Sequence, residues 1–148
     1  MNPKFFVEAL KEADKALKKD EVPIGAVIVH KGKVIARAHN LRETKQDTLT
    51  HAELLVISKA CKKLGSWRLE DCELYVTLEP CPMCAGAISQ ARISKVYYGA
   101  KDPKGGAESL GISIHDNKKL NHRFEMVFYA VERCGKILSE FFKLKRKK

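Results

Sequence analysis

Apolar residues near the start of the chain recur every three or four positions. The lysines of the same stretch fall on the opposite side, which is the pattern of a helix with one buried stripe. Pro3 suits the first turn of such a helix, because proline has no backbone N–H to donate there. We therefore predict an opening helix whose role is packing. Its apolar stripe consists of Phe6, Ala9, Leu10, Ala13 and Leu17.

The pattern then changes to short, nearly continuous apolar runs, which are typical of strands. Residues 22–29 form one run, and His30-Lys31-Gly32-Lys33 is a turn that leads into a second strand over residues 34–39. Three further runs predict strands over residues 73–78, 95–99 and 124–129. The first of these is apolar almost throughout, which predicts burial on both faces of a sheet.

Helical spacing of apolar residues alternates with these strands. One helix is predicted over residues 51–64 with Gly65 as its stop signal, a second over residues 82–91, and a third closes the chain. Strands and helices that alternate after an opening hairpin predict an α/β fold: a three-layer α/β/α arrangement around a mixed sheet of about five strands. At 148 residues, we expect a single domain over residues 1–148. Residues 40–50 are polar and turn-like, so we expect them to line a pocket.

Cysteine number and the length of the apolar runs indicate the compartment. The run over residues 22–29 is the longest, and it contains Pro23 and Gly25, so we expect neither a signal peptide nor a membrane span. Five cysteines are an odd number and too few for a disulfide scaffold. They favour a reducing compartment and a metal-binding role, and we expect a cytoplasmic protein.

The formal net charge of +10 is unevenly distributed, and five of the last six residues are basic. A basic end beside Phe141 and Phe142 suits contact with a phosphate backbone together with base stacking, and we expect Phe141 and Arg146 to bind substrate. The alternative is a solubilising end on a helix whose phenylalanines are core residues. Together with the global charge, the lysines favour nucleic acid as a partner. The basic residues are Lys143, Lys145, Arg146, Lys147 and Lys148.

His51, Cys81 and Cys84 could hold a metal ion. Zinc with three protein ligands keeps a fourth position for water and is catalytic, whereas zinc with four protein ligands is structural. The two cysteines are three residues apart, so one helical turn brings both sulfurs to one face, and Pro82 suits the first position of that helix. The positive end of the helix dipole there favours thiolates, which are the metal-binding form.

Glu53 follows His51 by two residues, and the two side chains can converge only at the start of a helix. Thr50 is a good N-cap for that helix, so a capping box between Thr50 and Glu53 is an alternative that needs no chemistry. For the cysteine pair, the alternatives are a redox motif or half of a structural zinc knuckle. The remaining cysteines stand singly and form no second C-x-x-C pair.

In combination, the two motifs are much more specific than either is alone. His51-x-Glu53 followed by Pro80-Cys81-x-x-Cys84 is the established signature of zinc-dependent nucleobase deaminases. We therefore predict a deaminase in which zinc activates a water molecule and Glu53 shuttles the proton.

The chain resembles the bacterial tRNA adenosine deaminases, which have the cytidine-deaminase-like fold, over nearly its whole length. The zinc motifs would fit any member of that superfamily, whereas the later stretches and the basic end point to the tRNA enzymes. The matching stretches are EVPIGAV (21–27), AHN (38–40), HAE (51–53), PCPMCAGA (80–87), GAKD (99–102), LNHR (120–123) and SEFF (139–142).

This resemblance implies hydrolysis of adenosine to inosine at the wobble position of a tRNA anticodon stem-loop, by a homodimer with one zinc ion per subunit. It also implies that Asn40 binds the edge of the base and that Asp102 lies beside the ribose. Each has a plain alternative, because Asn40 suits a turn at a strand end and Asp102 suits a type I turn. The chain departs from the family pattern at residues 47–50 and is only loosely similar over residues 108–117.

Two other functions remain open from the sequence. A deaminase of free nucleobases or nucleosides, such as guanine or cytidine, would use the same zinc site but would not need a basic tail. A non-catalytic zinc module that binds RNA would keep Glu53 only as a helix cap.

Overall fold

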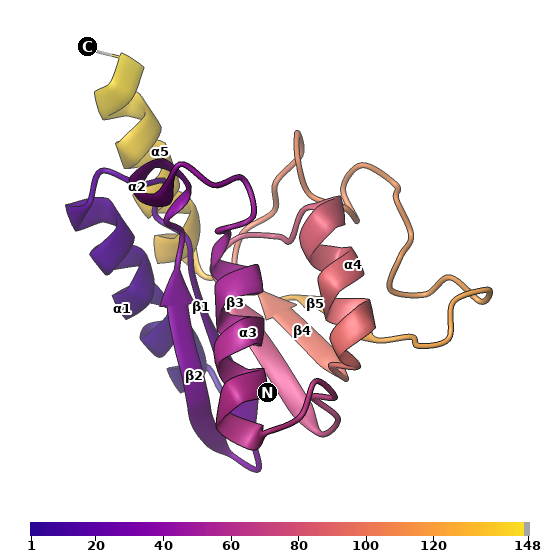
Figure 1. Cartoon of the computed structure of the whole chain (residues 1–148). Coiled ribbons are helices and arrows are strands. Elements are labelled where there is room, and N and C mark those ends of the chain that lie inside the picture. The colour runs from indigo at the N-terminus through magenta and orange to yellow at the C-terminus, as the bar shows by residue number, and fades with distance from the viewer. Residues whose placement is uncertain (147–148) are drawn as a thin grey trace.

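In a computed structural model, which describes residues 1–146, helices cover both faces of a five-stranded sheet (Figure 1). The strands are β1 (Gly25–His30), β2 (Lys33–His39), β3 (Cys72–Val76), β4 (Lys95–Tyr98) and β5 (Glu125–Phe128). The helices are α1 (Lys4–Lys18), α2 (Arg42–Lys45), α3 (Ala52–Leu64), α4 (Pro82–Ala91) and α5 (Glu132–Arg146).

The strand order is β2-β1-β3-β4-β5, with β1 antiparallel to both neighbours and β3, β4 and β5 parallel. The hairpin between β1 and β2 turns at Lys31 and Gly32, which both have positive φ (51° and 78°), as a tight hairpin turn requires. The parallel pair β3 and β4 is joined through α4, because parallel neighbours need a crossover. The predicted mixed sheet of about five strands is therefore confirmed.

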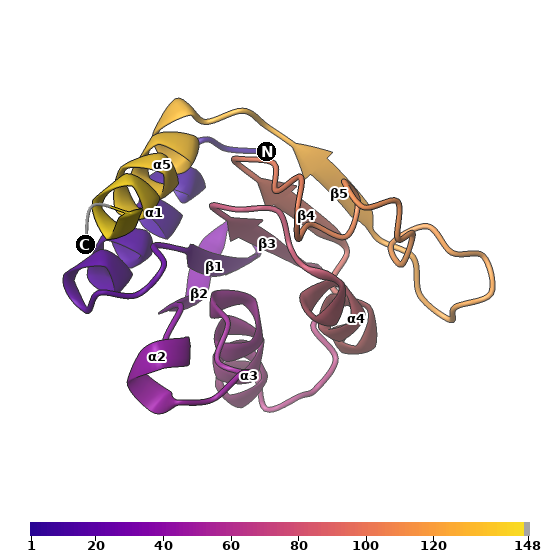
Figure 2. The same ribbon diagram turned by 90° about the horizontal axis from the view of Figure 1, so that it is seen from above.

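The layers follow from which side chains each strand presents to each face. In β1, Ala26 and Ile28 pack with α3 and α4, whereas Val27 and Val29 pack against α1. Burial on both faces explains why this strand is a continuous apolar run. Figure 2 shows α1 and α5 on one face of the sheet and α3 and α4 on the other, which confirms the predicted three-layer arrangement.

Two connecting segments differ from simple loops or helical crossovers. The predicted loop over residues 40–50 contains the short helix α2. Residues 99–124 join β4 to β5 without a helix or strand, and the chain there is held by side-chain hydrogen bonds described below. Within residues 1–146, no helix has the length and apolar character needed to cross a bilayer.

Candidate active site

Helices α3 and α4 lie side by side on one face of the sheet and begin at the same end of it (Figure 1). His51 is the N-cap residue of α3 and Cys81 is the N-cap residue of α4, both with extended backbone. Neither helix start has a hydrogen bond from a capping side chain. Pro82 occupies the first turn of α4, as predicted. The shared starting edge therefore brings the imidazole and the two thiols together.

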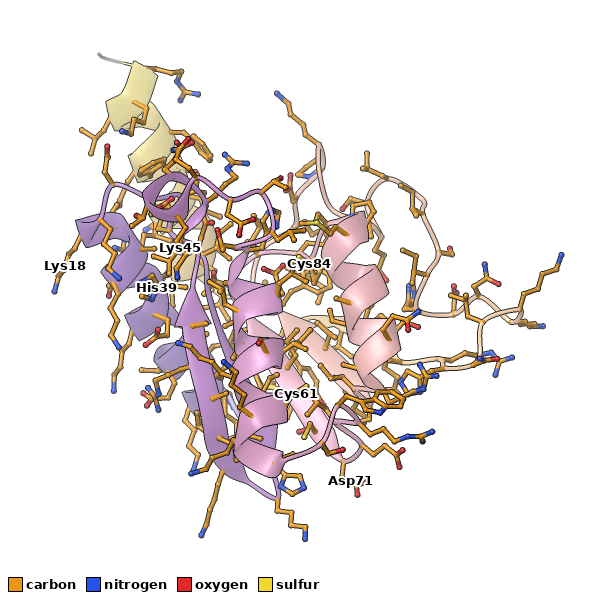
Figure 3. The ribbon with its side chains drawn as sticks, in the orientation of Figure 1. Lys18, His39, Lys45, Cys61, Asp71 and Cys84 are labelled. Carbon is orange, nitrogen blue, oxygen red and sulfur yellow. The ribbon has the colours of Figure 1, made fainter. Side chains whose placement is uncertain are left out.

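The distances within this cluster fit a zinc ion. The Nδ1 atom of His51 lies 3.8 Å from the Sγ atom of Cys81 and 3.5 Å from that of Cys84, and all three atoms lie within 4.8 Å of one another. Two ligands of tetrahedral zinc, with ordinary Zn–N and Zn–S bonds, are about 3.6 Å apart. Figure 3 shows Cys61 well below Cys84, so this third cysteine does not belong to the cluster.

The electrostatics of the cluster favour binding of a cation. A hydrogen bond from the Cys84 thiol lowers the pKa of Cys81 to about 4, and a hydrogen bond with His51 acts in the same direction. The bond to Cys81 and burial raise the pKa of Cys84. The contact with Cys81 also raises the pKa of the His51 imidazole. Cys81 is thus the more acidic of the two thiols, and a bound cation would favour the thiolate form of both.

Glu53 lies in the first turn of α3, beside the cluster. Its side chain is not part of a capping box, because Thr50 donates its hydroxyl to the carbonyl oxygen of Asp47 (2.7 Å) and His51 is the N-cap. The predicted N-cap at Thr50 is therefore wrong. Glu53 is 5% exposed, and burial raises the pKa of its carboxyl to about 7. A carboxyl with this pKa can take up and release a proton near neutral pH.

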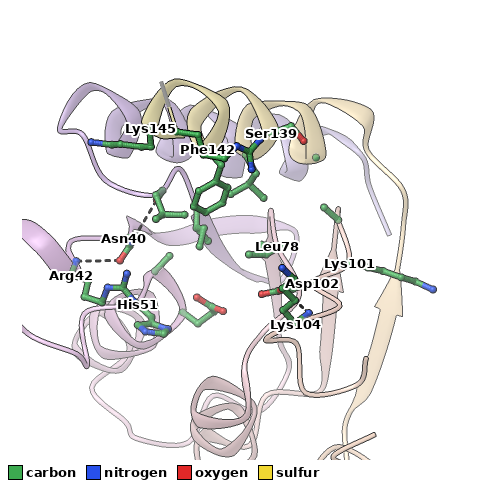
Figure 4. Close-up of a pocket in the computed structure, with 18 residues that line it drawn as sticks. Asn40, Arg42, His51, Leu78, Lys101, Asp102, Lys104, Ser139, Phe142 and Lys145 are labelled. Atoms are coloured by element: carbon green, nitrogen blue, oxygen red, sulfur yellow. Dashed lines mark hydrogen bonds between the residues drawn. The ribbon is translucent and has the colours of Figure 1, made fainter. Parts of the chain in front are cut away.

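A cavity of about 910 Å³ opens over His51 and Glu53. Figure 4 shows Asn40, Arg42 and His51 on one side of it and Leu78, Asp102 and Lys104 across from them, with Phe142 pointing in from α5. Of the residues predicted from the sequence, five line this cavity directly, and the two cysteines lie against His51. The five are Asn40, His51, Glu53, Asp102 and Arg146.

Phe141 is the predicted site residue that the structure separates from this cavity. Its side chain is 7% exposed and packs in the closing helix, with the ring of Phe142 edge-on at 5.4 Å between centroids. It lines a second, smaller hollow beside Lys19 and Lys145. Phe142 is 45% exposed and lines both hollows. The geometry therefore favours Phe142 over Phe141 as the aromatic residue available to a substrate.

Asn40 and Asp102 already make hydrogen bonds to the backbone. The Asn40 amide donates to the carbonyl oxygen of Val22 (3.3 Å) and accepts from the N–H of Arg42 (3.1 Å). Oδ1 of Asp102 accepts from the N–H groups of Lys104 (3.3 Å) and Gly105 (3.0 Å). Each group keeps further capacity, because an amide has a second hydrogen and a second lone pair and a carboxylate has a second oxygen.

Several basic residues at the cavity were not predicted as site residues. Arg42 and Lys104 lie on its two sides, and Lys145 joins Arg146 at the end of α5. Lys101 also borders the cavity, but its ammonium lies 5.0 Å from the centre of the Phe128 ring and points outward (Figure 4). Arg42 could have been found from the expectation that residues 40–50 line a pocket. Lys104 offered no signal beyond its place in a turn.

Known proteins match this chain over nearly its whole length. The family model for MafB19-like deaminases matches residues 2–146. A tRNA-specific adenosine deaminase of Bacillus subtilis (strain 168) is 56% identical over 145 residues, which cover 97% of this chain and 90% of that protein. This chain belongs to the tRNA-specific adenosine deaminase family. A member from Aquifex aeolicus (strain VF5) is 46% identical and covers 97% of this chain and 95% of its own length.

Solved structures agree with this membership. A structure from a study of A-to-I editing by tRNA:A34 deaminases at the wobble position of transfer RNA is 49% identical, with a TM-score of 0.80 over 85% of this chain and 97% of that chain. A guanine deaminase from Bacillus subtilis is 33% identical, with a TM-score of 0.66 over 99% of this chain and 95% of that one. The tRNA-specific adenosine deaminases thus share their fold with an enzyme of free bases, and the fold alone does not set the substrate.

Proposed function

We propose that this tRNA-specific adenosine deaminase hydrolyses adenosine to inosine at the wobble position of a tRNA anticodon. The observation that carries the proposal is the buried Glu53 carboxyl beside the cluster of His51, Cys81 and Cys84, at the floor of a cavity with basic residues around it. The 56% identity to a tRNA-specific adenosine deaminase of Bacillus subtilis supports the substrate.

The chemistry divides between a zinc ion and the side chains of the chain. His51, Cys81 and Cys84 would hold the ion, which when bound acidifies a water molecule for attack on the base. Glu53 accepts the proton of that water at its carboxylate and delivers it to the ring nitrogen next to C6 as the C–O bond forms. It then takes the proton of the new C6 hydroxyl and passes it to the amino group, which leaves as ammonia while the C6 carbonyl forms. A carboxyl that is only 5% exposed keeps bulk water from competing for that proton.

The other cavity residues are proposed to hold the nucleotide. Asn40 offers its remaining donor and acceptor to the edge of the base, which presents both kinds of group. Asp102 accepts a hydrogen bond from the 2′-hydroxyl of the ribose, a group that DNA lacks. Phe142 offers an exposed ring for stacking, and Arg146 offers its guanidinium to a phosphate. Phe141, which is buried, supports Phe142 from behind.

Assembly and location complete the proposal. Residues 1–148 would act as a single domain in a cytoplasmic homodimer with one zinc ion per subunit and the tRNA anticodon stem-loop as its partner. A partner subunit would cover apolar side chains that are exposed in the single chain. They include Leu49, Met83, Leu110 and Ile112.

The test is to incubate the purified protein with cellular tRNA and to sequence the products, in which inosine is read as guanosine. A change confined to the first anticodon position supports the proposal. The same preparation is assayed for ammonia released from free guanine, cytidine and adenosine. Faster release from a free base or nucleoside than from tRNA would contradict it and would favour the other enzyme class.

A non-catalytic zinc module that binds RNA is the second alternative. Glu53→Gln separates it from the enzyme, since a binding module would keep its RNA affinity and would have no deaminase activity to lose. Deamination by the wild-type protein that disappears in this variant would exclude the binding module.

A further inference from the structure

Glu79 is a buried carboxylate that the reaction described above does not use. It lies between β3 and α4, two residues before the metal-ligand candidate Cys81, and is 2% exposed. Its oxygens accept three hydrogen bonds from the segment that follows β4. The donors are the N–H of Asp102 (3.0 Å), the N–H of Ser109 (2.7 Å) and the hydroxyl of Ser109 (2.5 Å). A carboxylate is buried at low cost only when it is bonded in this way.

Residues 79–80 and residues 100–107 are in close contact. The N–H of Glu79 donates to the carbonyl oxygen of Ala100 (2.9 Å), and the N–H of Ala107 donates to the carbonyl oxygen of Pro80 (2.9 Å). At Gly106 there is no room for a side chain, because a Cβ atom would lie 2.1 Å from the carboxyl carbon of Glu79. Residues 100–109 are therefore laid directly onto the residues that lead into the metal cluster.

The Asp102 side chain depends on this attachment. Its Oδ1 atom is oriented by the N–H groups of Lys104 and Gly105, which belong to the same turn, so the carboxylate follows its own backbone. The N–H of Asp102 is the group that Glu79 binds. Backbone hydrogen bonds at Ala100 and Ala107 hold the two ends of this segment, and residues 99–124 contain no helix or strand that would add to them.

We propose that Glu79 is a positioning residue that fixes Asp102 relative to the metal cluster and thereby sets selectivity for ribose over deoxyribose. The inference rests on the proposed function, in which Asp102 faces the ribose. One carboxylate then connects the two parts of the site, since it is continuous in sequence with Cys81 and bonded to the backbone of Asp102. Glutamine cannot replace it, because its amide NH₂ would face an N–H donor at one of the two oxygen positions.

The test compares Glu79→Gln with wild type. We expect bound zinc to be unchanged and amide hydrogen exchange at Asp102 and Ser109 to become much faster. On an RNA stem-loop, kcat/KM is expected to fall by about tenfold, which is the scale of one lost hydrogen bond to a charged group. On the deoxy counterpart, kcat/KM should fall by less than about threefold. The double variant with Asp102→Asn should show the same RNA-to-deoxy ratio as Asp102→Asn alone, because both changes act through one contact.

Glu21→Gln is the matched control. Glu21 is 0% exposed and accepts the same set of donors, two backbone N–H groups and one hydroxyl, but from Glu43 and Thr44 of α2. Glu21→Gln should lower the melting temperature about as much as Glu79→Gln does. It should not change hydrogen exchange at Asp102 or the RNA-to-deoxy ratio of kcat/KM.

The inference would be overturned by loss of zinc in Glu79→Gln, by unchanged hydrogen exchange at Asp102, or by an equal fall in kcat/KM on both hairpins. An RNA-to-deoxy ratio of kcat/KM that changes in Glu79→Gln but not in Asp102→Asn would also overturn the inference, because Glu79 would not be acting through Asp102. A wild-type protein that deaminates neither hairpin would contradict the proposed function, and the exchange measurement would still decide whether Glu79 holds the turn.

Discussion

The Nδ1 atom of His51 lies 3.5 Å from the Sγ atom of Cys84, at the starts of two helices that are neighbours in space. If these atoms bind one zinc ion, Cys84→Ala should lose the metal and deamination together. Glu53→Ala should keep bound zinc near the wild-type level while activity falls by about a hundredfold or more, the contribution of general acid–base catalysis. Metal content by elemental analysis, measured beside kcat, checks both. Zinc lost in Glu53→Ala would make Glu53 a ligand or a structural residue.

Removal of residues 143–148 should weaken tRNA binding and reduce the dependence of log Kd on log salt, because fewer counterions are released. The rate at saturating substrate should be unchanged. In the structure, Lys145 lies 2.6 Å from Asp20 and Arg146 lines the cavity, whereas Lys147 and Lys148 lie outside the described residues. Titrations at several salt concentrations provide the measurement. A slope equal to that of the full chain would show that the tail only solubilises the protein.

Phe141 and Phe142 are adjacent and make a matched pair of opposite exposure. Phe142→Ala should weaken the binding free energy for the stem-loop by about 1–3 kcal/mol, the contribution of one stacked base, with little change in melting temperature. Phe141→Ala should lower the free energy of unfolding by about 3–5 kcal/mol, because it empties a buried position. Binding titrations and denaturant melts on both variants test this. Equal loss of affinity in the two variants would remove the stacking role from Phe142.

Asp102→Asn keeps a side-chain acceptor and much of the turn preference while it removes the negative charge. We expect it to narrow the gap in kcat/KM between an RNA stem-loop and its deoxy counterpart, since the carboxylate repels phosphate in both but bonds a 2′-hydroxyl only in RNA. Both hairpins are measured at one salt concentration, with thermal melts to check folding. If the two substrates change by the same factor, Asp102 acts only as a turn residue.

The lowered pKa of Glu21 predicts how the stability of the fold depends on pH. Burial raises the pKa of this carboxyl, but the hydrogen bonds from Thr44 and Glu43 outweigh it and leave the pKa below its ordinary value of 4.5. The stability that Glu21 contributes is therefore present above pH 4.5 and lost as pH falls through the lowered pKa. Glu21→Gln should lower the free energy of unfolding by about 1–3 kcal/mol at pH 7. The difference from wild type should shrink in denaturant melts between pH 5 and 3, and a constant difference would contradict this account.

The elements with strong periodicity were predictable, and the pairing of α3 with α4 was predictable through the metal motif. Helix α4 begins at Pro82 and ends at Ala91, as its sequence indicates. The short helix α2 was not predicted, because it is held from outside by Glu21, which lies more than twenty residues earlier. Local sequence does not report such a partner.

The same limit applies to the site. The ligands and Glu53 stand in a spacing that their chemistry requires, so the sequence identifies them as candidates. Phe141 and Phe142 are chemically identical, and only the rotation of α5 against α1 decides that one ring is buried and the other lines the cavity. The role of Glu79 is not visible in the sequence, because a glutamate before a proline has no distinctive pattern and its partners lie 23 and 30 residues away.

The N-cap positions of α3 and α4 are occupied by His51 and Cys81, and neither side chain caps its helix. A metal ion bound to both residues would take over the task of fixing the two helix starts, since it holds each N-cap residue in its extended conformation. Chelation would then loosen the first turn of both helices at once, and Glu53 would lose its fixed position together with the ion. Zinc binding by this enzyme would then be coupled to the ordering of both helix starts.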